Sequence, residues 1–479
     1  MSPAPAARAR PHDAPTLDPP PEVREIARTL EQAGFETWCV GGAVRDALLG
    51  LAHLDWDLAT SATPPEIKRA FRRTIPVGEQ FGTIGVLDRN GRLHEVTTFR
   101  RDVQTDGRHA VVAFGASLDE DLARRDFTIN AIAFSPKSGA LHDPFGGRDD
   151  LAHGVVRAVG VPRERMVEDR LRALRAFRFA GRFGFRIEPM TWAAIVESAP
   201  FLPRLSPERV KQELEKTMEQ VLSPGAALRL WQRAGALREL APVLDAQPLW
   251  VLHSADHIAS PDATGSAPHE RRRTLLRLAT LFVGLSPELA TRSLRDLRFS
   301  NHDIGWISAL AAHATSLRPH LRTALEEPAP VADGVLRRWA AATGRTRLAD
   351  TLRVGLATLA SERELGIGAD SGDEILCEPH DGDAGASRSG RGNTADPWTR
   401  ARRLYRRALR VAYRDPVEVA DLAVDGEDLM RDGGVARGPA LGAMLRRLRD
   451  AVVDDPSRNH REQLIAQARA WSDPPRRGE

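Results

Sequence analysis

Apolar and polar residues in the first third of the chain follow two alternating patterns, one typical of short strands and one typical of short helices. Period-two runs at 37–40 and 54–58 predict strands, whereas the three-to-four-residue spacing at 22–32 and 43–49 predicts helices. Thr63 followed by Pro64 is a common helix start and predicts another helix. The first part of the chain therefore mixes strands with helices.

Two further apolar runs, 83–87 and 93–99, flank the sequence Asp88-Arg89-Asn90-Gly91. Asn-Gly readily adopts the positive φ angles of a tight turn, so these runs predict a β-hairpin. From about residue 162 to about residue 365 the strand pattern disappears and helical spacing takes over. We therefore predict an α/β head followed by an all-helical remainder.

Composition marks the boundaries between these parts. The Pro- and Ala-rich start is typical of a disordered leader, and a Gly-, Asp- and Ser-rich segment after the helical region is typical of a linker. The predicted order is a leader at 1–21, a head at 22–160, a helical neck at 161–240, a helical body at 241–367, a linker at 368–397 and a helical tail at 398–479.

The 479 residues are 42% hydrophobic and 28% charged, which indicates a soluble globular protein rather than a fibrous or membrane one. No apolar run approaches the roughly 20 residues that cross a bilayer, and the first residues lack the apolar core of a secretory signal. Cys39 and Cys377 are the only cysteines, which excludes a disulfide framework or a cysteine-rich zinc site. We expect a cytoplasmic protein.

Positive charge is carried almost entirely by arginine, since only four of the 68 basic residues are lysines. Guanidinium groups bind phosphate bidentately and stack on bases. A genome rich in G and C favours arginine codons and explains the overall bias equally well, but it does not explain local clusters.

The first candidate for chemistry is the stretch Val40-Gly41-Gly42-Ala43-Val44-Arg45-Asp46, in which a predicted strand meets a helix through two glycines. Gly41 and Gly42 would let backbone amides approach a phosphate at the positive end of the helix. Arg45 could clamp the same anion. Taken alone, the pattern is also typical of an ordinary structural turn.

Two aspartates follow on the next predicted strand. Asp55 and Asp57 would face one side while Trp56 faces the other. Adjacent carboxylates repel one another, and Mg²⁺ bound to phosphate oxygens is a common partner for such a pair. Glu95, on the neighbouring hairpin strand, could supply a third carboxylate or could be an ordinary strand charge.

Two later segments concentrate charge next to apolar residues. In Arg124-Arg125-Asp126-Phe127-Thr128-Ile129-Asn130, the side chains of Asp126 and Asn130 could bind ribose hydroxyls while Arg125 meets phosphate. The run 168–178 predicts an amphipathic helix whose carboxylates and guanidiniums share a face. That face could be a salt-bridge stripe, or it could read the edge of a nucleobase.

These motifs together closely resemble the class II tRNA nucleotidyltransferase and bacterial poly(A) polymerase family. The resemblance is dense over about 35–240 and resumes near the C-terminus. It rests on VGGAVRDALLG, LDWDLAT, EVTTFR, TDGRHA, RRDFTINA, DPFGG, EDRLRALRAFRF and LSPERVKQELEK, and then on DLAVDGEDLM and DDPSRNHREQLIAQA. It implies an α+β fold: a polymerase-β-like nucleotidyltransferase head with a mixed sheet, followed by an elongated all-α neck, body and tail.

The resemblance also implies roles for individual residues. It makes Asp55 and Asp57 the metal-binding pair, Gly42 and Arg45 part of the triphosphate site, and Arg125 and Asp126 a ribose- and phosphate-binding motif. Four residues would lie on a helix that binds the base of CTP or ATP, namely Asp169, Arg172, Arg175 and Arg178. Asp106 and Arg108 would lie in a flexible loop that helps switch from C to A addition.

The implied activity is template-independent addition of CMP and AMP to the 3′ end of tRNA by two-metal phosphoryl transfer with Mg²⁺. Expected partners are tRNA, CTP and ATP, with no membrane or DNA. Alternatives are a poly(A) polymerase, an enzyme that adds only A, and an inactive RNA-binding homologue. Some relatives carry an additional HD phosphohydrolase domain; here His253, Asp256 and His257 lack its order, so no such site is expected.

Overall fold

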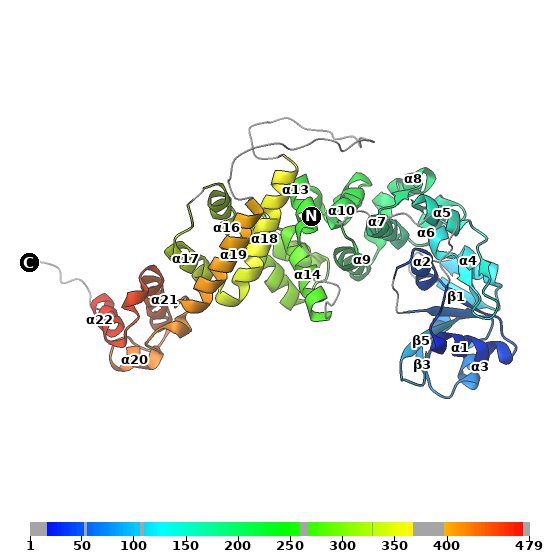
Figure 1. Cartoon of the computed structure of the whole chain (residues 1–479), viewed down its shortest axis with the longest axis horizontal. Helices are drawn as coiled ribbons and strands as arrows, with labels where there is room; N and C mark the ends of the chain where they lie inside the picture. The colour runs from blue at the N-terminus through cyan, green and yellow to red at the C-terminus, as the bar shows by residue number, and fades with distance from the viewer. Residues whose placement is uncertain are drawn as a thin grey trace, which may run out of the picture. The chain divides into compact units, whose positions relative to one another are not determined.

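The computed structural model describes residues 17–51, 55–105, 110–258, 267–327, 329–366 and 397–472. These residues belong to two compact units, Met1–Asp245 and Ala246–Glu479 (Figure 1). Most of the predicted leader and linker, and both loop residues Asp106 and Arg108, lie outside the described residues.

A seven-stranded mixed sheet forms the centre of the first unit, in the order β3-β4-β5-β2-β1-β8-β9. Its strands are β1 (Thr37–Val40), β2 (Asp57–Thr60), β3 (Thr74–Gly78), β4 (Thr83–Leu87), β5 (Leu93–Thr98), β8 (Ala133–Phe134) and β9 (Leu141–His142). Only the β2–β5 pair is parallel among the pairs within this sheet. A separate antiparallel ribbon consists of β6 (Arg100–Thr105) and β7 (Ala110–Phe114).

Short helices accompany the sheet. They are α1 (Pro21–Gln32), α2 (Gly42–Leu48), α3 (Pro64–Ala70), α4 (Leu118–Ala123) and α5 (Gly147–His153). Thr63 and Glu66 form a capping box at the start of α3, as the Thr-Pro start predicted. Val40 of β1, Ala59 of β2 and Leu122 of α4 belong to one buried cluster, so the strands that carry the candidate site rest on a packed core.

The hairpin and the first strand are confirmed, but the second strand begins at Asp57 rather than at residue 54. Asp57 pairs with Val40, the last residue of β1. The chain turns away at Gly41, so Asp55 and Trp56, the described residues just before Asp57, have no partner in this ladder. The predicted alternation still holds, because Asp55 and Asp57 are exposed while Trp56 is buried.

Helices follow the head to the end of the first unit: α6 (Pro162–Glu168), α7 (Leu171–Phe183), α8 (Pro189–Ser198), α9 (Pro207–Gln220), α10 (Pro224–Arg233), α11 (Ala236–Leu240) and α12 (Pro242–Asp245). One prediction fails here, because strand pairing continues past residue 162. The two-residue strand β11 (Arg186–Ile187) lies parallel to β10 (Val155–Val156).

The helix predicted over 168–178 is interrupted. Helix α6 ends at Glu168, Asp169 is extended with φ −147° and ψ 105°, and α7 begins at Leu171. The Asp169 carboxylate accepts a hydrogen bond from the Leu171 amide at 3.0 Å. Such local bonds from aspartate compete with helix continuation, so Asp169 precedes the helix that we expected it to lie on.

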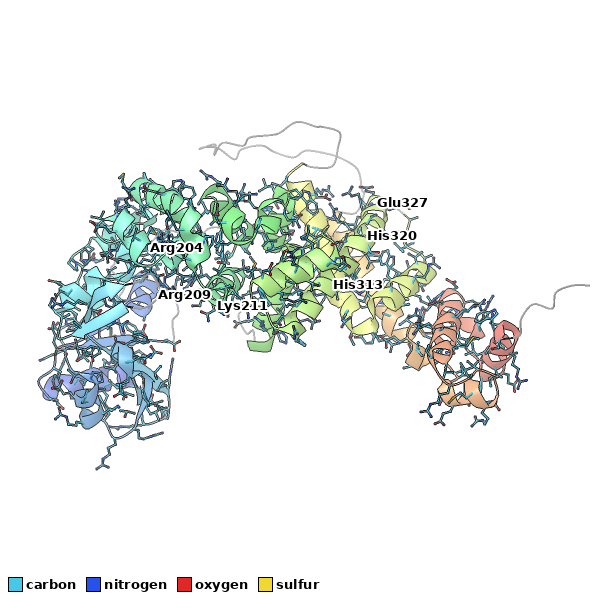
Figure 2. The ribbon with its side chains drawn as sticks, turned by 180° about the vertical axis from the view of Figure 1, so that it is seen from behind. Arg204, Arg209, Lys211, His313, His320 and Glu327 are labelled. Atoms are coloured by element: carbon cyan, nitrogen blue, oxygen red, sulfur yellow. The ribbon has the colours of Figure 1, made fainter. Side chains whose placement is uncertain are left out.

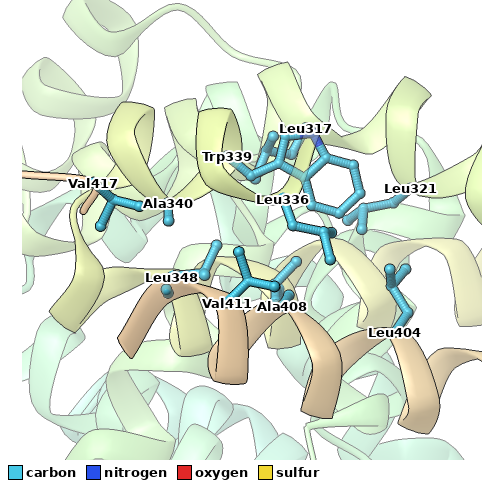
Figure 3. Packing of buried hydrophobic residues seen from close by; sticks show 12 residues of the cluster. Leu317, Leu321, Leu336, Trp339, Ala340, Leu348, Leu404, Ala408, Val411 and Val417 are labelled. Carbon is cyan, nitrogen blue, oxygen red and sulfur yellow. The ribbon is translucent and has the colours of Figure 1, made fainter. Parts of the chain in front are cut away.

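The described part of the second unit consists of helices and short turns. Its principal helices are α13 (Leu249–Ser254), α14 (Ala267–Thr280), α15 (Pro287–Asp296), α16 (Asn301–Glu326), α17 (Asp333–Thr343), α18 (Arg345–Glu364), α19 (Pro397–Arg414), α20 (Gly426–Arg431), α21 (Pro439–Asp454) and α22 (Arg461–Ser472). Figure 3 shows residues from α16, α17, α18 and α19, among them Leu321, Trp339, Leu348 and Leu404, packed in one core. Among the described residues, no helix is both long enough and apolar enough to cross a bilayer.

Candidate active site

The corner between β1 and α2 is built from a glycine that no other residue could replace without strain. Gly41 has φ 76° and ψ −134° and precedes the first turn of α2. A Cβ atom at Gly41 would lie 3.0 Å from Nη1 of Arg125 and 4.0 Å from Oδ2 of Asp57. The corner, one predicted phosphate-binding arginine and one predicted metal-binding aspartate therefore meet at one place.

The sheet explains how the carboxylates come together. Asp57 begins β2, and β2 lies parallel to β5 with Leu58 opposite Val96, which places Glu95 next to Asp57 on the neighbouring strand. Desolvation, the charge of Glu95 and, more weakly, the charge of Asp55 raise the pKa of Asp57 to about 6, although Arg125 opposes this. The carboxylates thus repel one another, and a bound cation would relieve that repulsion.

Asp55 lies open to solvent beside the other two carboxylates. Its side chain is 93% exposed and accepts a hydrogen bond from Nη2 of Arg92 at 3.1 Å. Among the residues that the structure describes, Asp55, Asp57 and Glu95 do not form a set with all ligand atoms within 4.8 Å of one another. Asp57 and Glu95 are neighbours across two strands, whereas Asp55 is held by an arginine beside them.

Arg45 lies beneath the corner rather than in the open. Its guanidinium donates to Oδ1 of Asp46 at 2.6 and 2.8 Å and to Oδ1 of Asn130 at 2.5 Å. It also lies over the rings of Phe179 and Phe183, at 5.0 and 4.9 Å from their centres. In this structure Arg45 therefore braces the glycine turn against α7, while Gly42 adjoins it in the first turn of α2.

Asp126 and Asn130 are also engaged within the protein. Asp126 accepts hydrogen bonds from the Phe127 amide and Asn130 at 2.8 Å, and from Arg175 at 2.7 Å. Burial alone would raise the pKa of Asp126, but Arg175 and these hydrogen bonds lower it to about 2. Both polar groups that we expected to meet ribose are thus buried and paired with protein groups.

Arg125 differs from its neighbours. Its guanidinium donates to Asp121 at 3.1 Å and, through Nη1, to the Asn130 carbonyl at 3.4 Å. Its Nε is buried and has no hydrogen-bond acceptor within the described part of the chain. Because Nη1 also adjoins Gly41, Arg125 is the arginine best placed to meet an anion at the corner.

The four residues expected to bind the base separate into two kinds. Arg172 and Arg178 are buried: Arg172 donates to Glu168 and to the Arg124 carbonyl at 2.8 Å, and Arg178 donates to Glu213 at 2.8 Å. Asp169 and Arg175 each keep about a third of their side chains exposed, 32% in both cases. Only these two of the four keep substantial contact with solvent.

Several residues that the sequence reasoning did not assign hold this arrangement. Arg209 of α9 donates hydrogen bonds to both carboxylate oxygens of Asp169, at 3.0 and 2.8 Å. Figure 2 labels Arg209 together with Arg204 and Lys211. Asp46 bridges Arg45 to Arg182, at 2.9 Å from the latter. The signal for α9 was present, since Arg209 and Glu213 are four residues apart in LSPERVKQELEK and therefore share a face.

Two known family models match segments of the first unit, one in the head and one in the helices that follow it. Residues 37–157 match the poly A polymerase head domain, which contains the glycine corner and the carboxylates. Residues 184–247 match a domain described as the probable RNA and SrmB-binding site of polymerase A.

Full-length relatives decide the family. The chain is 33% identical over 455 residues to the CCA-adding enzyme of Levilactobacillus brevis, covering 92% of this chain and 96% of the relative. It belongs to the CCA-adding enzyme family. The CCA-adding enzyme of Streptococcus gordonii is 35% identical over 459 residues, covering 93% and 97%.

A solved member of the CCA-adding enzyme family has the same architecture. The crystal structure of the Bacillus stearothermophilus CCA-adding enzyme in complex with CTP superposes with a TM-score of 0.69 at 29% identity, covering 94% of this chain and 96% of that one. The predicted fold class, a mixed-sheet head followed by helical domains, is confirmed. Family membership also confirms that the chain is a nucleotidyltransferase.

Proposed function

We propose that this chain adds CMP and AMP to the 3′ end of tRNA to make the CCA sequence, without a nucleic-acid template. The observation that carries the proposal is the corner at Gly41, where Arg125 and Asp57 meet, within a chain that matches CCA-adding enzymes along almost its whole length. In the reaction, the RNA 3′-hydroxyl forms a bond to the α-phosphorus of the bound nucleotide. The bond to pyrophosphate breaks, and pyrophosphate leaves.

Enzymes of this family depend on a metal ion, and we propose that the ion is Mg²⁺. Asp55 and Asp57 would hold it, with Glu95 as a third carboxylate, because oxygen ligands and phosphate suit Mg²⁺. The raised pKa of Asp57 supports this assignment, since desolvation and the nearby charges of Glu95 and Asp55 disfavour its ionised form and a bound cation would favour it. When bound, Mg²⁺ neutralises charge on the phosphates and polarises the attacking hydroxyl.

The protein's own groups position the nucleotide. Backbone amides at Gly41 and Gly42, at the start of α2, would approach the triphosphate while Arg125 binds it from the other side of the corner. Arg45 would keep the corner in place from beneath, and Asp126 and Asn130 would reach the ribose only by exchanging bonds that they make within the protein.

Base selection would lie at the junction of α6 and α7. Asp169 and Arg175 are the partly exposed groups there, and an aspartate accepts from a base amino group whereas an arginine donates to base acceptors. Arg172 would orient Asp169 through Glu168 and the backbone, and Arg178 would hold α7 against Glu213 of α9. Asp106 and Arg108 stay proposals for the loop that changes specificity from C to A.

A single assay tests the whole proposal. tRNA ending at the discriminator base is incubated with Mg²⁺ and CTP, ATP or both, and the products are resolved at single-nucleotide length. CCA addition requires both nucleotides to give three added residues. Addition of A alone would instead support the A-only alternative, and a long A tail would support a poly(A) polymerase.

The matched variants are Asp55→Ala and Asp57→Ala, which should abolish incorporation while tRNA binding persists in a filter assay. Retained incorporation would contradict the metal assignment, and no incorporation by the unaltered chain would support an inactive RNA-binding homologue. We place the activity in the cytoplasm, because two cysteines in 479 residues suit a reducing compartment.

A further inference from the structure

A cluster of metal-ligating side chains lies in the second unit, where the end of α13 meets the end of α18. His253 is in the last turn of α13, and His257 ends the following short helix η4 (Ala255–His257). Glu364 is the last residue of α18, more than 100 positions later in the sequence. One ligand atom from each residue can be chosen so that all three lie within 4.8 Å of one another.

The individual contacts converge on one carboxylate. Oε2 of Glu364 lies 3.1 Å from Nε2 of His257 and 3.8 Å from Nε2 of His253. In tetrahedral zinc sites with metal–ligand bonds near 2.0–2.1 Å, ligand atoms lie about 3.3 Å apart. The observed separations are close to that value, so small side-chain rotations would accommodate an ion.

A second carboxylate orients one of the histidines. Oδ2 of Asp256 lies 3.0 Å from Nδ1 of His253. A carboxylate on Nδ1 fixes the imidazole tautomer with its proton on that nitrogen and leaves Nε2 available as a ligand. Asp256 therefore aims the His253 lone pair at the side where Glu364 lies.

The other histidine is poorly served by the protein alone. Nε2 of His257 is shielded from solvent, and none of its contacts in the described structure meets hydrogen-bond geometry. This nitrogen lies 3.1 Å from Oε2 of Glu364, and a metal ion bound between the two would give it the partner that it lacks.

The surrounding charge and packing fit a fixed site. Ser361 of α18 donates a hydrogen bond to the Trp250 carbonyl of α13 at 2.7 Å. Ser361 comes three residues before Glu364, and Trp250 comes three residues before His253. Arg277 of α14 is buried, and its charge interacts favourably with that of Asp256. The two helices are therefore joined next to the cluster, and Glu364, whose side chain is 59% exposed, offers an entry path for an ion.

We propose that His253, His257 and Glu364 bind a divalent transition-metal ion of the Zn²⁺ type, with Asp256 as the orienting group. Imidazole nitrogen with one carboxylate suits Zn²⁺, whereas Mg²⁺ prefers oxygen ligands. The ion would fasten α13 and η4 to α18 and stabilise the second unit. These residues belong to the second unit, whereas the carboxylates of the head belong to the first.

The test titrates the full chain with Zn²⁺ by calorimetry in millimolar Mg²⁺, which occupies the carboxylates of the head. The unaltered chain should bind one equivalent of Zn²⁺ that Glu364→Gln and His257→Gln lose. Asp256→Asn should weaken binding by about 10–100-fold, as for other groups that orient a metal ligand. His320→Gln is the control, since His320 is an exposed histidine on α16 (Figure 2).

Two further readouts distinguish a metal site from a plain ion pair. Co²⁺ in the unaltered chain should give a visible absorption band that Glu364→Gln lacks. Zn²⁺ at about 100 times its Kd should raise the melting temperature by about 5 °C or more, with Mg²⁺ giving no such rise. Equal Zn²⁺ stoichiometry in the unaltered and Glu364→Gln chains would overturn the proposal, and so would a melting temperature that Zn²⁺ leaves unchanged.

Discussion

Replacing the buried carboxylate of Asp126 by an amide should destabilise the first unit by a predictable amount. Asp126→Asn keeps the size of the side chain but removes the charge that Arg175 binds at 2.6 Å. The pKa of Asp126 is lowered from 3.8 to about 2, a difference of about 1.8. At about 1.4 kcal/mol for each unit of pKa, the ionised state contributes about 2 kcal/mol, or roughly 10- to 100-fold in the opening equilibrium.

The sign of the pH dependence follows from the same shift. A carboxyl with a lowered pKa contributes stability that is present above the unfolded pKa and is lost as pH falls through the folded pKa. The difference in the free energy of unfolding between the unaltered chain and Asp126→Asn should therefore have its full size at pH 7 and nearly its full size at pH 5. At pH 3, between the folded and unfolded pKa values, about half of that contribution to the free energy of unfolding should remain.

Hydrogen exchange measured by mass spectrometry resolves the two units and suits this prediction. Peptides covering α7 should lose protection by roughly 10- to 100-fold at pH 7 in Asp126→Asn, whereas peptides of the second unit should be unchanged. Urea unfolding at pH 7, 5 and 3 then supplies the pH dependence. Asp119→Asn is the control, because Asp119 is an exposed carboxylate on α4. A loss below threefold in α7, or a difference that does not narrow at pH 3, would refute the reasoning.

Four further predictions concern the corner and the base-binding region. In EDTA, Asp57→Asn should raise the melting temperature above pH 6 and not at pH 4, because the raised pKa means that ionised Asp57 destabilises the folded state. An equal rise in melting temperature at both pH values would contradict this prediction. Gly41→Ala should lower turnover by tenfold or more. Gly139→Ala is the control and should leave turnover unchanged, because Gly139 has a similar positive φ but no atom within 4 Å of its Cβ position. A similar loss of turnover in both variants would show that backbone strain alone is responsible. Asp169→Ala should blur the choice between CTP and ATP in competition assays without a matching loss of tRNA affinity, and unchanged selectivity would contradict base reading. Arg178→Ala should lower stability, because the buried Glu213 carboxylate loses the guanidinium that donates to it at 2.8 Å and is left with Lys216 at 3.9 Å.

Local patterns in the sequence were enough for the elements around the corner. Alternating apolar residues predicted β1 and the hairpin, and the Gly-Gly pair predicted the turn into α2, because these features depend on neighbours within a few residues. The side-by-side position of Asp57 and Glu95 depends instead on the parallel pairing of β2 with β5. The sequence offered Glu95 as a third carboxylate or as an ordinary strand charge, and spacing along the chain does not reveal the strand pairing that places it beside Asp57.

Long-range partners also decided what the charged side chains do. Arg45, Asp126 and Arg178 looked alike as exposed candidates for phosphate, ribose or base, yet each is buried against a partner at least 35 positions away. The break at Asp169 was missed for a different reason. Its side chain satisfies the Leu171 amide, and helical spacing on either side hides the interruption.

The buried ion pairs give the arginine-rich helix α7 a second purpose. Asp46 joins α2 to Arg182 near the end of α7, and Asp126 joins the segment after α4 to Arg175 near its middle. Since a carboxylate or guanidinium left alone in the interior is costly, each pair permits few alternative positions of α7. Asp169 lies two residues before this helix and Gly41 directly precedes α2. The same charges that resemble a nucleotide-binding surface in the sequence therefore fix the distance between the place where a base would be read and the place where its phosphates would lie.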